Sequence, residues 1–180
     1  MKQITNTMIQ TFNDRIAEAE GCQVFFPQDV DLIEEDYVRG VYGFFKSKDG
    51  EEEECFYVGK TSNMRDRMIG PSGHITEFLH NRNKKIDPDN KRKRSVPIKI
   101  EKLVGDGYTV NIRIIKIVPY DFSKSYEYNA NLLCLEELSA LIEKQNAGEC
   151  VDQLSESVKN NEKRSWNSAL KAYEEGAAGT

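Results

Sequence analysis

The strongest constraint on the fold is a pair of short apolar segments joined by a turn signal. Residues 37–45 and 55–58 are rich in aromatic and β-branched side chains, and an Asp-Gly pair lies between them at 49–50. Asp-Gly favours the tight turn of a β-hairpin, in which both central residues adopt positive φ angles. The sequence therefore predicts an antiparallel hairpin. Alternation along its first strand places Tyr42 and Phe44 on the same face.

Hydrophobic periodicity predicts further elements around this hairpin. Apolar residues recur at three- and four-residue spacing, which is typical of helices, over 5–20, 75–79, 131–146 and, with few anchors, 151–173. A short helix is also expected after a cap at Thr61 or Ser62. Alternation over 108–118 predicts a third strand, whereas 98–104 fits either a helix or an extended segment.

These elements indicate an α+β fold, a small three-stranded antiparallel sheet flanked by helices, with helical arms at both ends. We expect an N-terminal arm over 1–36, a core domain over 37–147 and a C-terminal tail over 148–180. No apolar run approaches the ~20 residues that span a bilayer, and no signal peptide is recognisable, so we expect a protein without a membrane partner. The four cysteines are scattered without a CxxC pair, which favours free thiols over a zinc site.

Charge is distributed unevenly along the chain. The net charge of -5 opposes nucleic-acid binding, but one polar segment, 82–94, is strongly basic and contains Pro88, which predicts a loop. Such a loop suits contact with a phosphate backbone, although a solvated loop without a partner would have the same composition. Its candidate DNA-binding residues are Lys84, Lys85, Lys91, Arg92, Lys93 and Arg94.

Two tyrosines and an arginine can converge on the hairpin. If Tyr42 and Tyr57 share a face, their phenol groups meet beside Arg67, which follows on the next helical turn. A buried tyrosine hydroxyl needs a hydrogen-bond partner, and an arginine is rarely buried without one. Each residue alone fits an ordinary strand or a solvated helix, but together they indicate a functional site.

The same residues resemble the GIY-YIG nuclease family, which includes homing endonucleases and some restriction enzymes. Gly40-Val41-Tyr42 is similar to the first half of the family motif, and the run Tyr57-Val58-Gly59-Lys60-Thr61 is similar to the second half. Arg67 follows Tyr57 by ten residues, as the family's catalytic arginine does, and Asn63 also matches. The two tyrosines are fifteen residues apart, more than is usual in the family, and we assign the excess to the hairpin loop 46–54. The resemblance covers about 37–146.

The resemblance implies a DNA endonuclease that hydrolyses phosphodiester bonds with one Mg²⁺ or another divalent cation such as Mn²⁺. Tyr42 or Tyr57 would help to take a proton from water, with Lys60 and Arg67 stabilising the phenolate. Arg67 would also hold the scissile phosphate. His74 lies where some members carry a histidine that could shuttle a proton, but a surface or capping histidine would fit the sequence equally.

The family's metal ligand is a glutamate on the last core helix. Helix geometry places Glu137 at the edge of an apolar face, whereas Glu136 points away from it. That face is formed by Leu133, Leu138, Leu141 and Ile142. The apolar pair begins four residues after Glu137, one more than is usual in the family, so Glu136 stays an alternative.

We therefore expect a cytoplasmic, restriction-like or mobile-element-associated endonuclease of prokaryotic or phage origin. Its expected partner is double-stranded DNA, and self-association is compatible with the sequence. The competing hypothesis is a nuclease-derived module that has lost catalysis and binds DNA or a protein.

Overall fold

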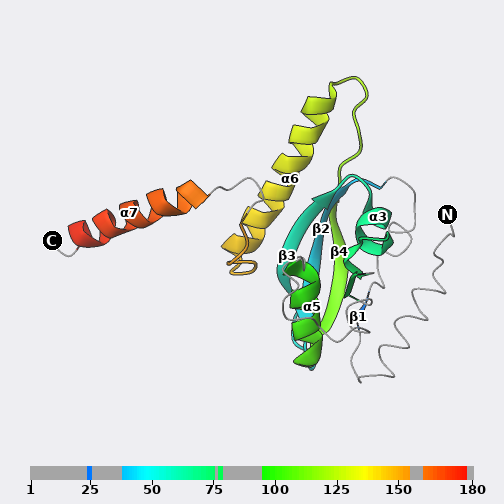
Figure 1. Ribbon diagram of the computed structural model, residues 1–180, viewed down its shortest axis with the longest axis horizontal. Coiled ribbons are helices and arrows are strands. Elements are labelled where there is room, and N and C mark those ends of the chain that lie inside the picture. Colours follow the sequence, from blue (N-terminus) through cyan, green and yellow to red (C-terminus); the bar gives the residue numbers. More distant parts are fainter. Residues whose placement is uncertain (1–23, 26–37, 76, 79–94, 155–159, 178–180) are drawn as a thin grey trace.

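The computed structural model describes residues 24–25, 38–75, 77–78, 95–154 and 160–177 (Figure 1). Two predictions lie outside these residues, the N-terminal helix over 5–20 and the basic segment with its candidate DNA contacts. Within the described residues the fold is α+β, with helices against a small open sheet.

The centre of the fold is the predicted antiparallel sheet. Strands β2 (Gly40–Ser47), β3 (Glu54–Thr61) and β4 (Thr109–Ile117) are antiparallel, with β2 between the other two. A two-residue strand, β1 (Val24–Phe25), pairs in parallel with β4 and gives the order β1-β4-β2-β3. The three-stranded antiparallel arrangement is confirmed, and β1 is an addition to it. Strand β3 is therefore an edge strand of the sheet.

The hairpin turn has the backbone that its Asp-Gly pair predicts. Asp49 and Gly50 both have positive φ angles, 52° and 83°, and the amide of Glu51 donates to the carbonyl of Lys48 at 2.9 Å. Lys46 and Glu54, which were expected in the loop, pair in the ladder, so both strands extend further toward the turn. A register shift between Phe44 and Phe45 also absorbs part of the extra length. Assigning the whole excess to the loop 46–54 was therefore wrong.

The described helices are α3 (Met64–Ile69), α5 (Ser95–Gly105), α6 (Tyr126–Asn146) and α7 (Asn160–Ala177). The first three pack against the sheet, whereas α7 extends away from it (Figure 1). The segment left open at 98–104 is thus helical, and residues 74–75 and 77–78 are helical as well. The cap of α3 is Asn63, whose side chain accepts from the Asp66 amide. The predicted caps Thr61 and Ser62 are wrong because the Thr61 hydroxyl binds the backbone of Asn63 instead. None of the described helices has the length and apolar character needed to cross a membrane.

The two faces of the sheet carry separate cores. Tyr42 and Phe44 pack with α3 and α5 on one face, as alternation predicts. Val41 and Phe45 pack with α6 on the other. The site residues can therefore be assigned to one face or the other.

Gly40 lies on β2 between strands β3 and β4, where the backbones are close together. A Cβ atom there would lie 2.1 Å from the Lys116 carbonyl oxygen, which is backbone and cannot rotate away. We expect Gly40→Ala to lower the free energy of unfolding by about 2 to 4 kcal/mol, measured by denaturant titration. The matched control is Gly105→Ala, where a Cβ would meet no atom within 4 Å, and it should stay within about 1 kcal/mol of wild type. Equal stability of both variants would contradict this packing.

Candidate active site

The hydroxyl of Tyr42 is the centre of a buried polar cluster. Its oxygen accepts a hydrogen bond from Nε of Arg67 at 3.0 Å and lies 2.9 Å from Nε2 of His74. The Tyr57 ring is 6.2 Å away between centroids, and its phenol interacts with both Tyr42 and Arg67. Strands β2 and β3, helix α3 and the helical residues 74–75 thus each contribute one side chain. The structure brings together four of the six predicted catalytic and metal-binding residues here.

Gly59 makes the meeting of the two phenols sterically feasible. It pairs with Tyr42 across the β2–β3 ladder. A Cβ atom at this position would lie 2.7 Å from the Tyr42 hydroxyl oxygen and 2.8 Å from the Tyr57 ring. The glycine of the Tyr-Val-Gly motif is therefore needed for space, and any larger residue would drive the rings apart.

Helix α3 sets the position of Arg67. Asn63 fixes where the helix begins, and buried Met64 and Met68 orient it against the sheet. Arg67 then points at Tyr42 and is half-buried. Burial acts to lower the pKa of Arg67, but the phenol groups of Tyr42 and Tyr57 outweigh it and raise that pKa above its usual value. The guanidinium is thus positively charged at any physiological pH.

Tyr42 itself stays protonated. Burial and the neighbouring Tyr57 raise its pKa well above the usual value, although Arg67 lowers it. Its oxygen accepts from Arg67 and shares a second hydrogen bond with Nε2 of His74. His74 is 2% exposed, so the alternative of a surface histidine is wrong. Arg67 and His74 thus hold the Tyr42 phenol from two sides.

Lys60 and Glu137 form a second cluster on the opposite face of the sheet. The Lys60 ammonium lies 2.5 Å from Oε2 of Glu137, which projects from α6 and is only 7% exposed. Glu136 instead pairs with Lys116 at 2.6 Å. Of the two glutamates left open by the sequence, Glu137 is the one that pairs with Lys60, the lysine that follows the Tyr-Val-Gly run.

The buried face of α6 differs from the predicted apolar face. Leu133 and Leu141 are buried together with Glu137, but Leu138 and Ile142 are 40% and 47% exposed. The helix carries apolar residues over more of its circumference than the sheet can cover. Prediction from apolar spacing therefore included two residues that face away from the sheet.

Strand β3 connects the two clusters. Tyr57 and Gly59 contribute to the Tyr42 face, and Lys60 reaches the α6 face from the next position along the chain. Strand β3 is at the edge of the sheet, so its side chains on the two faces both lie next to that edge. A ligand at the Lys60 end of this edge, beyond the part that Glu149 and Gln153 bond, would have both clusters within reach.

A metal ion at this site would have one protein carboxylate. Within the described ranges, no group of three or more His, Cys, Asp and Glu residues could hold a metal. Glu137 still fits Mg²⁺, which proteins often bind through one or two carboxylates together with water and substrate phosphate oxygens. The ammonium of Lys60 holds one of its carboxylate oxygens in this structure.

A polar network behind the site was not anticipated from the sequence. Buried Arg39 donates to the carbonyls of Val118 and Asn129 and stacks on Tyr120, 4.4 Å from the ring centroid. This network holds the loop between β4 and α6 (Figure 1). Aromatic rings are exposed on the loop and at the start of α6. The exposed rings are Tyr120 and Phe122 on the loop, with Tyr126 and Tyr128 on the first turn of α6, and Phe122 is 92% exposed. The high aromatic content of this polar loop is the sequence signal that could have revealed it.

Comparison with known proteins provides no relative for this site. No protein-family model, curated protein or solved structure matches the chain. The nuclease resemblance therefore rests on the motif residues and on the geometry described here.

Ionisation of Tyr42 provides a direct test of the buried cluster. Its raised pKa means that the unfolded chain ionises this hydroxyl near pH 10.0 while the folded chain does not. Stability should therefore be unaffected by Tyr42 below this pH and fall by about 1.4 kcal/mol per pH unit above it. In a near-ultraviolet titration of tyrosinate absorbance, one of the eight tyrosines should ionise at a higher pH than the others and give a late component.

The late component should vanish in Tyr42→Phe and persist in Tyr173→Phe, a control at an exposed position. A late component that persists in Tyr42→Phe would show that Tyr42 is not the protected phenol.

Proposed function

We propose that this protein is a metal-dependent endonuclease that hydrolyses phosphodiester bonds in double-stranded DNA. The observation that carries the proposal is the convergence of Tyr57 and Arg67 on the buried Tyr42 hydroxyl, across a glycine that leaves space for both rings. A cation fixed beside a phenol suits an anionic substrate whose charge increases during attack by water.

The difference in solvent exposure between Tyr42 and Tyr57 suggests different roles for them. Tyr42 is 0% exposed and stays protonated, so it is a positioning residue for Arg67. Tyr57 is partly exposed, and it is the phenol that a water molecule can reach. We assign the proton transfer from water to Tyr57, with Arg67 beside it to stabilise negative charge. His74 would hold the Tyr42 phenol in place.

Arg67 and Lys60 would bind the scissile phosphate from the two sides of the β3 edge. Each is partly exposed and positively charged, and each is anchored by a buried partner. Glu137 would hold Mg²⁺ or Mn²⁺ together with phosphate oxygens, and the ion would supply charge neutralisation at the leaving oxygen. In this assignment Lys60 also keeps the Glu137 carboxylate oriented.

The aromatic loop after β4 would add contacts to DNA. It leaves the sheet where Ile117 pairs with Gly40, and Gly40 pairs in turn with Thr61, just before α3. Its rings therefore lie at the end of the sheet that also carries the start of α3. Exposed rings on an anchored loop suit stacking on bases at a distorted step. The basic segment 82–94 would supply further phosphate contacts.

The competing function is a DNA- or protein-binding module without catalysis. One observation favours it: Glu137, the candidate metal ligand, is already engaged by Lys60. A restriction-like or mobile-element role and self-association remain proposals that depend on the nuclease activity.

The decisive experiment is incubation of the full chain with several supercoiled and linear DNAs, with Mg²⁺ and with a chelator. We expect cleavage that requires the metal and falls at least about 10²-fold in Arg67→Ala and in Glu137→Ala. The matched control is Glu136→Ala, which removes a neighbouring carboxylate paired with exposed Lys116 and should retain activity. If the protein cleaves none of these DNAs, the result would favour the binding module.

The tyrosine assignment is checked in the same assay from the dependence of rate on pH. Tyr57→Phe should lower the rate and remove the rise with pH that ionisation of the base produces. Tyr42→Phe should lower the rate but leave the shape of that profile unchanged. The opposite pattern would make Tyr42 the base.

The contribution of the aromatic loop can be measured with a fluorescent DNA duplex at fixed salt. Phe122→Ala should weaken binding by about tenfold, because one stacked base contributes ~1–3 kcal/mol. Tyr173→Ala on α7 removes another exposed ring and is the control. Equal affinity of both variants would exclude the loop from the DNA interface.

A further inference from the structure

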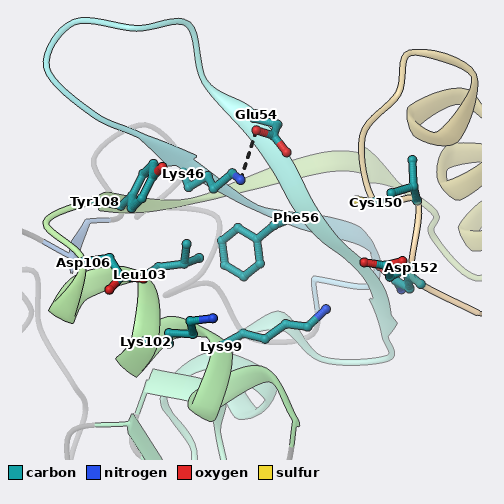
Figure 2. A pocket seen from close by; sticks show the side chains of 12 residues that line it. Lys46, Glu54, Phe56, Lys99, Lys102, Leu103, Asp106, Tyr108, Cys150 and Asp152 are labelled. Carbon is teal, nitrogen blue, oxygen red and sulfur yellow. Dashed lines mark ion pairs between the residues drawn. The ribbon is translucent and has the colours of Figure 1, made fainter.

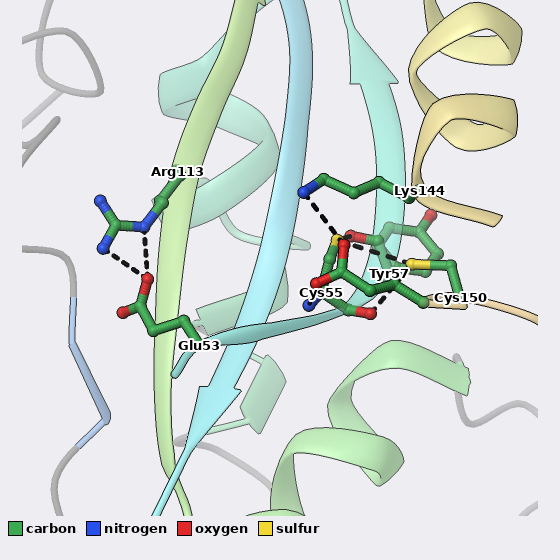
Figure 3. Close-up of polar contacts among 7 residues, drawn as sticks. Glu53, Cys55, Tyr57, Arg113, Lys144 and Cys150 are labelled. Atoms are coloured by element: carbon green, nitrogen blue, oxygen red, sulfur yellow. Dashed lines mark hydrogen bonds and ion pairs between the residues drawn. The ribbon is translucent and has the colours of Figure 1, made fainter. Parts of the chain in front are cut away.

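Two cysteines far apart in the sequence lie in contact beside strand β3. Cys55 and Cys150 are separated by 95 positions, yet their sulfur atoms are 3.5 Å apart (Figure 3). Both are buried and both are free thiols. Neither takes part in the proposed nuclease site, so their contact is an independent feature of the molecule.

The backbone around this pair is held in register by a short segment after α6. The amide of Cys150 donates to the Cys55 carbonyl at 3.3 Å, and the amide of Cys55 donates to the Glu149 carboxylate at 3.0 Å. Further along, the Gln153 side chain accepts from the Val58 amide at 2.8 Å and donates to its carbonyl. Residues 149–153 thus cover the edge of β3 from Cys55 to Val58 much as another strand would.

This arrangement is close to that required for a disulfide. An S–S bond is ~2.05 Å long and joins residues whose Cα atoms are ~4.4–6.8 Å apart. The hydrogen bond from the Cys150 amide to the Cys55 carbonyl places the two backbones next to each other. The two sulfur atoms need to approach by only about 1.5 Å, which side-chain rotation can supply without rearranging the segment.

We propose that Cys55 and Cys150 form a reversible disulfide that fastens the segment after α6 to strand β3. The oxidant is a low-molecular-weight disulfide such as oxidised glutathione. The thiolate of one cysteine attacks a sulfur of the oxidant and releases one small thiol, leaving a mixed disulfide. The second cysteine loses its proton and attacks the protein sulfur of that mixed disulfide, which releases the other small thiol. The two cysteines are oxidised, and the small disulfide is reduced to two thiols.

Cys150 is the sulfur that meets the oxidant first. It lines a hollow of about 440 Å³, whereas Cys55 is 0% exposed (Figure 2). Lys99 and Lys102 line the same hollow and would attract an anionic oxidant. The hydrogen bond with Cys55 lowers the pKa of Cys150, and the charges of Lys99 and Lys144 act in the same direction. Burial and the contact with Cys150 raise the pKa of Cys55, so Cys150 is the initial thiolate.

The bond would connect the beginning of β3 to the end of α6 across most of the domain. A cross-link between such distant positions removes much of the conformational entropy of the unfolded chain, more so for longer loops. Oxidation should therefore stabilise the folded domain rather than open it. The inference does not depend on nuclease activity, because its readouts are thiol content and melting temperature.

The test uses the full chain with Cys22→Ser and Cys134→Ser, which leaves only the two cysteines in question. The folded protein is equilibrated with mixtures of reduced and oxidised glutathione, quenched with acid, unfolded and labelled with a maleimide. We expect loss of two labelled thiols, an intact mass lower by the two thiol hydrogens, and a peptide that links Cys55 to Cys150. The melting temperature should rise by roughly 10 °C and return after reduction.

Added Cys150→Ser and Cys150→Ala changes serve as controls, and neither variant should gain stability under oxidation. Two labelled thiols at every glutathione ratio would overturn the proposal. A glutathione adduct at Cys150 without the internal bond, or a disulfide between two chains, would overturn it as well.

Discussion

The buried hydroxyl of Tyr42 is the constraint on which the rest of the site depends. A phenol excluded from water must have hydrogen-bond partners, because leaving it without them would cost ~1–3 kcal/mol. Arg67 and His74 provide them, and each comes from a different helical segment. The positions of α3 and of the helical residues 74–75 are therefore coupled to one atom on β2. Gly59 completes the arrangement by leaving room for the ring.

Strand β3 connects this cluster to the Lys60–Glu137 pair and to the two cysteines. Its residues reach the Tyr42 face at Tyr57 and the α6 face at Lys60, and its outer edge is covered by the segment that carries Cys150. An edge strand needs such a cover because unpaired backbone groups invite association with other chains. Glu149 and Gln153 provide it with side-chain atoms. The same cover brings the two cysteines into contact.

Local features of the fold were predictable because they depend on neighbouring residues. The Asp-Gly turn, the alternation of Tyr42 and Phe44, and the third strand all follow from short-range preferences, and the structure has them. The extra residues of the hairpin were assigned to the loop, but cross-strand pairing extends the ladder into that segment. The sequence of one strand does not reveal such pairing. The cap of α3 was misassigned because three neighbouring polar residues compete for it.

The sequence by itself determined the hairpin, the sheet type and the identity of the two tyrosines and the arginine, because turn chemistry, alternation and motif spacing are recorded residue by residue. Tertiary structure alone decided which of these side chains is buried and which reaches solvent. It also placed Glu137 against Lys60 and Glu136 against Lys116, a choice that helical periodicity left open. The contact between Cys55 and Cys150 depends on how α6 returns to the sheet, and no local pattern encodes a meeting of residues 95 positions apart. The physical reason is that burial and pairing are properties of the packed faces, which exist only once distant segments have come together.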